Sequence, residues 1–425
     1  MTGQAATAVV TENQVLTVGT QEVGLGATGG LTVEQALGPQ RVNIEQLRGM
    51  AGGRGRIWAD KVLIILLSDA YMPHYRPNPA EPLPERLCLF RLSAIGDCCN
   101  IVPVVRTLQT QLPDTQLTWV MGKVEASLLG DLDGVEVIAH DKNNGTGTLR
   151  RQLGARRFDA LLLMQVALRA GLASRAVRAP LRVGFDRARA RDGHGLFINR
   201  RIPASPPGHV TEGFFGFCEA LGVRDRTLKW DIPVPQAARD EVDRLVAGTP
   251  LLVISPCSSE RFRNFRNWPA EHYAEVARHA ALHHGLQVVL TGGHSELEYA
   301  YAERIERALA GSNNVPVPNL VNLVGRTNLK TLFALIQRAT VVIAPDSGPV
   351  HMAVAAGTPA IGLYATSNPD RTGPVLGRKW VVNAYPAAVQ RFLKRSVETV
   401  RWGRRVRDPD AMSLITPAMV VERLD

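Results

Sequence analysis

The segment "APDSGPVHMAVAAG", residues 344–357, decides the fold of the second half of this 425-residue chain. An apolar run at residues 339–343 comes directly before it and is typical of a buried strand. The Asp-Ser-Gly-Pro turn leads into an alanine-rich stretch. Pro349 suits the first turn of a helix, where a missing N–H costs no hydrogen bond. The segment therefore predicts a strand, a tight turn and a helix.

The same turn has the properties of an anion site. The N–H groups of Val350 and His351 have no hydrogen-bond partner within the helix and point outward at its positive end. Small residues such as Ser347 and Gly348 let a phosphate approach these groups, while the Ser347 hydroxyl and the His351 ring add donors. Spacing alone favours an ordinary helix cap made by Asp346 or Ser347, because capping residues are common.

A second strand, turn and helix lie at residues 90–109, "FRLSAIGDCCNIVPVVRTLQ". Gly96 permits another molecule to approach closely, and Asp97 stands at the start of the helix. An aspartate here is either a helix cap or a general base that accepts the proton of an attacking hydroxyl. The sequence leaves both interpretations open.

A third turn, "SPCSSERFRNFRNWP" at residues 255–269, follows another short apolar strand. It places the serine pair Ser258-Ser259 and three arginines before a helix start at Trp268-Pro269. Arginine beside a helix N-terminus suits phosphate because its planar fork makes two parallel hydrogen bonds. A polar surface loop is the alternative.

Strands and helices alternate twice along the chain. The first series begins near residue 87, and the second begins at 251–254, after "WDIPVPQ" at 230–236. Such alternation predicts parallel sheets with right-handed crossovers. We therefore expect two doubly wound α/β halves, with a border near 230–250. Ligands bind such sheets at the carboxyl ends of the strands, where all three turns lie.

The chain carries a net charge of +10, which favours anionic partners. Basic residues gather at 169–201 and at 391–407, although charge runs are most often solvated faces. A nucleic-acid-binding protein is a rival interpretation. The sequence contains no recognition-helix, zinc-finger or RNP pattern, and aromatic residues make up only 6% of it.

No apolar stretch reaches the roughly 18 residues that a membrane-spanning helix needs, and no positively charged leader is visible. The five cysteines form no C-x-x-C pair. This pattern speaks against a disulfide framework or a zinc site and suits a reducing cytosol.

Several motifs together resemble glycosyltransferase family 9, the lipopolysaccharide heptosyltransferases. They are "RLSAIGD" (91–97), "SPCSS…RNWP" (255–269), "TGGHSE" (291–296), "LVGRTNL" (323–329) and "PDSGPVHMAVAAGTPAIGLY" (345–364). The last is the most specific, because Asp-Ser-Gly-x-x-His before an alanine-rich helix and Gly-x-Pro rarely arises by chance. The resemblance covers about residues 86–385.

The resemblance implies a GT-B fold, in which two Rossmann-like, doubly wound parallel-sheet domains face each other across a cleft. The expected divisions are a flexible extension (1–60), a linker (61–85), an acceptor-binding domain (86–240), a donor-binding domain (241–385) and a helical segment (386–425) that packs back on the first domain.

The implied reaction is an inverting, metal-independent transfer of heptose from ADP-L-glycero-β-D-manno-heptose to the inner core of lipopolysaccharide. No cofactor is expected. The acceptor is an anionic glycolipid, either Kdo-lipid A or its heptosylated form. We expect a cytoplasmic enzyme held peripherally at the inner membrane by its basic patches. Another GT-B enzyme with a different nucleotide sugar remains an alternative.

The resemblance also assigns site residues. Asp97 falls on the family's catalytic base. Donor-binding positions fall on Ser258, Ser259, Arg266, Glu296, Thr327, Asp346, Ser347, Gly348 and His351, with Arg261 and Arg263 as alternatives to Arg266 at the diphosphate. Ser93, Gly96, Arg169 and Arg187 are expected on the acceptor side.

Asp131-Leu132-Asp133 spells D-x-D, a sequence that binds a divalent cation in other glycosyltransferases. Glycines stand on both sides of it, between a helical pattern and a strand. Aspartate and glycine are typical turn residues, so we predict a turn here and no metal site.

Overall fold

The computed structural model describes residues 3–10, 16–23, 83–141, 143–246, 250–258, 264–310 and 320–425. Most of the expected extension and linker (1–60 and 61–85) therefore lies outside the described residues. Within the extension, β1 (Gly3–Val10) pairs antiparallel with β2 (Leu16–Val23). Two short segments of the extension that was expected to be flexible therefore form strands, and their β-branched valines and threonines favour that conformation.

The first half is a six-stranded parallel sheet in the order β5-β4-β3-β6-β7-β8. Its strands are β3 (Arg86–Phe90), β4 (Gln116–Gly122), β5 (Val135–His140), β6 (Ala160–Leu163), β7 (Leu181–Gly184) and β8 (Arg200–Arg201). The helices are α4 (Ile95–Gln111), α5 (Lys123–Leu129), α6 (Thr146–Leu153), α7 (Leu168–Ser174) and α8 (Val210–Ala220). Residues 87–90 of β3 and all of β6 are apolar and buried because helices cover both faces of such a sheet.

The second half repeats this order as β11-β10-β9-β12-β13-β14. Its strands are β9 (Leu251–Ile254), β10 (Gln287–Leu290), β11 (Val321–Asn322), β12 (Val341–Pro345), β13 (Ala360–Tyr364) and β14 (Val382–Asn383). The helices are α9 (Gln236–Leu245), α10 (Ala270–His284), α11 (Glu296–Ala310), α12 (Leu329–Arg338), α13 (Gly348–Ala356), α14 (Pro369–Thr372), α15 (Tyr385–Ala388) and α16 (Pro417–Leu424). Two doubly wound halves, as predicted, are confirmed.

In both sheets the strand order reverses between the first and fourth strands, as in Rossmann folds. These switch points lie between β3 and β6 in one half and between β9 and β12 in the other. Ligands bind outside the carboxyl ends of the strands at such points. The turns after β3, β9 and β12, which the sequence singled out, all occupy them.

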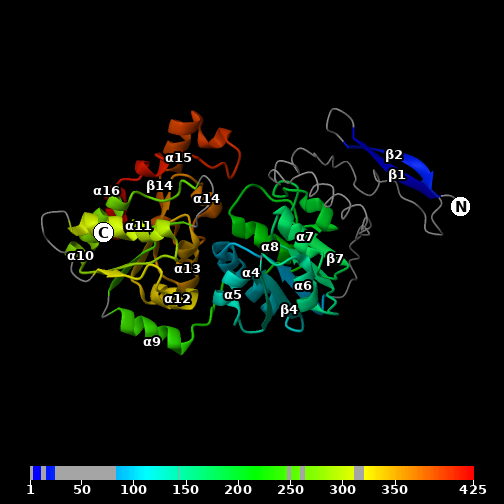
Figure 1. The fold of residues 1–425 in the computed structure, drawn as a ribbon, viewed down its shortest axis with the longest axis horizontal. Helices are drawn as coiled ribbons and strands as arrows, with labels where there is room; N and C mark the ends of the chain where they lie inside the picture. The colour runs from blue at the N-terminus through cyan, green and yellow to red at the C-terminus, as the bar shows by residue number, and fades with distance from the viewer. Residues whose placement is uncertain are drawn as a thin grey trace.

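The two halves touch through α4 and α13, which lie side by side at the centre of the molecule (Figure 1). One continuous cluster of buried apolar side chains includes residues of both halves. At its edge Lys330 of α12 contacts Asp131, with Nζ 2.6 Å from Oδ1. The D-x-D segment is a turn, as predicted. Its Asp131 forms an ion pair between the two halves.

The expected domain border at residue 240 is wrong, because it cuts through α9. This helix packs against α12 of the second half, and Thr331 of α12 donates a 2.6 Å hydrogen bond to Glu241. The chain crosses between the halves before Gln236.

The C-terminal segment also differs from expectation. Val406, Met412, Ile415 and Val420 are buried in the core of the second half, and Trp268 donates a 2.9 Å hydrogen bond to the Ile415 carbonyl. Residues 386–425 therefore pack mainly on the second half, because their apolar side chains complete its core.

The segment 386–425, expected to be helical, contains only short helical turns between α15 and α16. Trp402 reaches the first half with a 3.0 Å bond to the Gly208 carbonyl. Within the described part of the chain, every helix is too short or too polar to span a bilayer.

Candidate active site

The first-half side of the site is the start of α4. Ala94 is the N-cap residue, and Asp97 lies in the first helical turn. Asp97 is therefore not the cap, and its side chain pairs with the guanidinium of Arg91. Arg91 also donates to the carbonyls of Ser93 (2.6 Å) and Met164 (2.5 Å). These bonds hold Arg91, which in turn orients the Asp97 carboxylate at the end of β3.

The second-half side is the start of α13. Ser347 occupies the N-cap position, but its side chain makes no capping bond to the helix. Its hydroxyl donates instead to the Pro345 carbonyl at 3.0 Å. The ordinary side-chain cap is thus not made, and the helix end keeps the character of an anion site.

Asp346, directly before this helix, is buried and held in a network. It accepts a 2.8 Å hydrogen bond from Ser367 through Oδ2, and its carbonyl accepts a 2.7 Å bond from Arg266. The Arg266 guanidinium also lies 3.8 Å from Asp346 Oδ2. Asp346 therefore positions Arg266 beside the start of α13.

The two helix starts meet across the boundary between halves. A Cβ atom at Gly96 would lie 2.5 Å from His351 Cδ2, and one at Gly348 would lie 2.5 Å from Ile95 Cγ2. Asn100 Nδ2 lies 3.3 Å from His351 Nδ1. Both glycines are therefore required for the halves to approach, and part of the space beside Gly348 is occupied by Ile95.

The His351 ring is neutral in this environment. Burial lowers its pKa, and the carboxylates of Asp346 and Asp97 only partly offset that effect. The Asn100 amide donates from Nδ2, so His351 Nδ1 is the acceptor and the ring proton resides on Nε2. A neutral ring can donate a hydrogen bond from Nε2 and carries no positive charge that would repel the cations around it.

Arg371 of α14 is a further cation at this site. Burial lowers its pKa, and it interacts electrostatically with the carboxylates of Asp97 and Asp346 as well as with Arg191 and Arg405. The Arg371 guanidinium therefore interacts with carboxylates from both halves of the molecule. A guanidinium within electrostatic reach of both carboxylates is a candidate contact for a diphosphate.

The turn after β9 forms the next wall of the site. Ser258 is held by Asn264, whose amide donates to its hydroxyl at 2.7 Å, and by Asn267, which accepts at 2.9–3.0 Å. Asn264 also accepts a 3.0 Å bond from Arg266 Nε. The structure thus connects Ser258 to Arg266 and Asp346. Ser259, Arg261 and Arg263 lie outside the described residues.

Glu296 and Thr327 lie farther along the same edge. Glu296 is exposed at the first position of α11, after β10, and half-buried Thr327 lies between β11 and α12. The carboxylate that holds the loop after β10 belongs to Glu298, which accepts 2.7 Å bonds from Gly293 N and Ser295 Oγ.

The predicted acceptor-side residues divide into two groups. Ser93 and Gly96 lie beside Asp97, and the Ser93 hydroxyl accepts a 3.3 Å bond from Gln165. Arg169 and Arg187 are exposed and follow β6 and β7. They share the carboxyl edge of the sheet with Asp97.

Sequence reasoning missed Arg91, Asn100 and Arg371. Arg91 and Asn100 lie within the quoted turn at residues 90–109, and the strand-turn-helix pattern could have drawn attention to both. Arg371 follows β13 in the segment "SNPDRTG" (367–373), which was a detectable signal because it ends a strand at the same sheet edge.

The five cysteines are free and buried, and burial raises their pKa values, so they are poor nucleophiles. In the described residues, the cluster of histidine and carboxylate side chains spaced for a metal ion lies elsewhere, on α10 and after α16.

Comparison with known proteins gives a consistent picture. Residues 146–398 match the family model for glycosyltransferase family 9 (heptosyltransferase). The chain is 37% identical over 347 residues to the lipopolysaccharide core heptosyltransferase OpsX of Haemophilus influenzae. That alignment covers 80% of this chain and 96% of the relative.

Solved structures share the fold. A family 9 glycosyltransferase from Veillonella parvula superposes with a TM-score of 0.62 at 20% identity, covering 80% of this chain and 95% of that one. Escherichia coli heptosyltransferase WaaC with ADP gives 0.58 at 19% identity, covering 80% and 96%. WaaC with ADP-2-deoxy-2-fluoro heptose gives 0.59 at 19% identity, covering 80% and 98%.

Proposed function

The chain belongs to glycosyltransferase family 9, the heptosyltransferases, and we propose that it transfers a heptose from ADP-L-glycero-β-D-manno-heptose to the inner core of lipopolysaccharide. The observation that carries this proposal is the contact between the start of α4, which carries Asp97, and the α13 helix start with His351. One side supplies a base, and the other supplies an anion site for the leaving nucleotide.

The reaction is a single displacement with inversion. The acceptor hydroxyl oxygen attacks the anomeric carbon as the bond from that carbon to the diphosphate oxygen breaks. Asp97 takes the hydroxyl proton, and Arg91 holds the carboxylate in place. General-base catalysis by a positioned group typically contributes about 10²–10⁴ in rate.

Negative charge grows on the departing diphosphate. The α13 helix start, Arg266 and the neutral His351 lie where they can stabilise that charge, and Arg371 adds a second guanidinium. Fixed donors aimed at a developing anion are effective because they need no reorganisation during the reaction. None of these steps requires a metal ion.

The strand order accommodates an extended donor. Thr327, Glu296, Ser258 and Asp346 follow β11, β10, β9 and β12, which are neighbours in that order. Adjacent strands lie about 4.8 Å apart, so these positions span about 14 Å along one edge. The nucleoside would lie toward Thr327 and Glu296, and the sugar toward His351. The names of the solved WaaC complexes, with ADP and an ADP-heptose analogue, support this donor class.

The acceptor approaches from the first half. Arg169 and Arg187 are exposed on the edge that carries Asp97, where they can contact acidic sugars or phosphates. The name of the Haemophilus influenzae relative supports a lipopolysaccharide core acceptor. The exposed basic residues of 391–407 would contact anionic headgroups on the cytoplasmic face of the inner membrane, at about 1 kcal/mol per residue.

Mass spectrometry of the purified protein with ADP-heptose and Kdo₂-lipid A tests the proposal. We expect a product one heptose heavier, together with free ADP, and activity that persists in EDTA. Heptosylated Kdo₂-lipid A, tested in parallel, identifies the acceptor. Transfer from UDP- or GDP-sugars but not from ADP-heptose would overturn the donor assignment. Loss of transfer in EDTA, with recovery on adding Mg²⁺, would overturn metal independence.

A further inference from the structure

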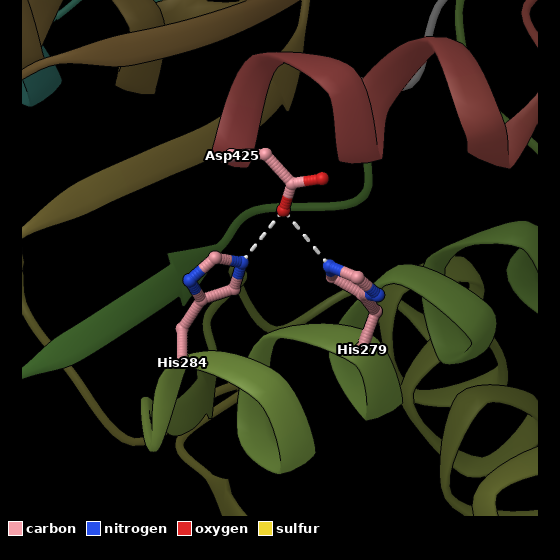
Figure 2. A group of neighbouring side chains, drawn as sticks. All are labelled: His279, His284 and Asp425. Atoms are coloured by element: carbon pink, nitrogen blue, oxygen red, sulfur yellow. Dashed lines mark hydrogen bonds and ion pairs between the residues drawn. The ribbon is translucent and has the colours of Figure 1, made fainter.

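A second cluster of reactive side chains lies away from the proposed active site. His279 and His284 belong to α10, and Asp425 follows α16. The Nε2 atoms of His279 and His284 lie 3.0 and 2.8 Å from the same oxygen, Oδ1 of Asp425 (Figure 2). All three potential ligand atoms lie within 4.8 Å of one another.

The two helices that carry this cluster are fixed by the core. α16 packs against α10, and Val420 of α16 and Val276 of α10 are fully buried. α10 ends immediately after His284, at Gly285, which adopts a left-handed conformation with φ 63°. The three side chains therefore converge from rigid elements, with little ordering left for a ligand to impose.

The donor set is chemically selective. Two imidazole nitrogens and one carboxylate oxygen suit Zn²⁺ and its first-row neighbours, whereas Mg²⁺ and Ca²⁺ prefer oxygen ligands. Bonds of about 2.0–2.2 Å to a tetrahedral zinc place its ligand atoms roughly 3.3–3.5 Å apart. Small side-chain rotations would bring the observed 2.8–3.0 Å spacings to that value.

We propose that His279, His284 and Asp425 bind one divalent transition-metal ion, with zinc as the expected occupant. The three side chains are partly exposed, at 24%, 31% and 55% of their maximum areas, which leaves a fourth position for water. The ion fastens α16 to α10. It is structural, because both helices lie at the outer end of the second half, away from α4 and α13 (Figure 1).

The test uses the full chain without a polyhistidine tag, stripped with a chelator, exchanged into buffer and titrated with Zn²⁺ or Co²⁺. Calorimetry should report one ion per chain, and Co²⁺ should give visible absorption bands of a site with nitrogen ligands. At 100 times Kd the melting temperature should rise by roughly 5 °C, because an ion that binds only the folded state stabilises it.

Three variants locate the site. His284→Ala and Asp425→Asn should each weaken metal binding by about 10²-fold or more. Even removing a residue that only hydrogen-bonds to a metal ligand typically lowers metal affinity by about 10–100-fold. His283→Ala is the matched control: its ring stacks on His279 at 4.5 Å, but it is not one of the three ligands. Binding should persist in this variant.

Two results would overturn the proposal: absence of stoichiometric binding, or binding that survives both His284→Ala and Asp425→Asn. Zinc protection of His279 and His284 from diethyl pyrocarbonate, read by mass spectrometry, needs no variant, and unprotected rings would equally contradict it. Glycosyl transfer is measured separately, so an inactive enzyme that still binds one ion would contradict the proposed function and not the proposed metal site.

Discussion

Gly96 and His351 touch across the boundary between the two halves: a Cβ atom added to Gly96 would lie only 2.5 Å from Cδ2 of the His351 ring. One residue stands beside the proposed base, Asp97, and the other stands in the first turn of the donor-side helix. The absence of a side chain at Gly96 therefore sets how closely base and leaving group can approach.

Gly96→Ala should reduce turnover by about 10²-fold, the loss associated with a misplacement of about 1 Å. Alanine is a good helix former, so the fold should be retained. Gly147→Ala is the matched control, because nothing lies within 4 Å of a Cβ there. Steady-state rates of both variants check the prediction, and equal rates would contradict it.

Asp97→Asn should lower kcat by about 10²–10⁴, because an amide cannot accept the acceptor proton. ADP affinity should remain within a few-fold of the wild type, since the proposed nucleotide contacts lie on the second half. Single-turnover kinetics and calorimetry separate the two effects. Wild-type turnover by this variant would remove Asp97 from the role of base.

Arg371→Ala should weaken ADP binding by about 10–100-fold, the size expected for losing hydrogen bonds to a charged group. Arg378→Ala is the matched control, because Arg378 is exposed and pairs with Asp370. Calorimetry with ADP measures both. Unchanged affinity in Arg371→Ala would show that its guanidinium does not reach the diphosphate.

His351→Ala should also weaken ADP binding, because it removes the Nε2 donor beside the α13 helix start. His283→Ala, at an exposed position on α10 of the same half, serves as the control. Affinity for ADP that matches the wild type would count against a diphosphate site at this helix end.

Stability should fall on acidification between pH 7.5 and 5. Burial lowers the pKa of His194 and His209 from 6.5 to about 4. Below pH 6.5 these two histidines become protonated in the unfolded chain but stay neutral in the folded one. Each therefore lowers the free energy of unfolding by about 2 kcal/mol at pH 5. Denaturant unfolding at both pH values measures the loss. His209→Gln should reduce it by about that amount; a loss equal to that of the wild type would contradict the assignment.

The alternation of strands and helices was readable from the sequence, because buried parallel strands are short apolar runs and helix ends carry glycine and proline. The strand expected at 251–254 is β9, with those bounds. The packing of the C-terminal segment 386–425 was predicted wrongly. It was expected on the first domain, but its apolar residues are buried in the second-half core.

The sequence by itself determined the two doubly wound halves, the family and the three turns at the switch points, since each depends on local pattern and spacing. Only the tertiary structure decided which residues of the two halves meet. The contacts of Gly96 with His351, Lys330 with Asp131 and Trp402 with Gly208 join residues more than a hundred positions apart. Such contacts depend on how finished elements pack in space, which no local propensity encodes.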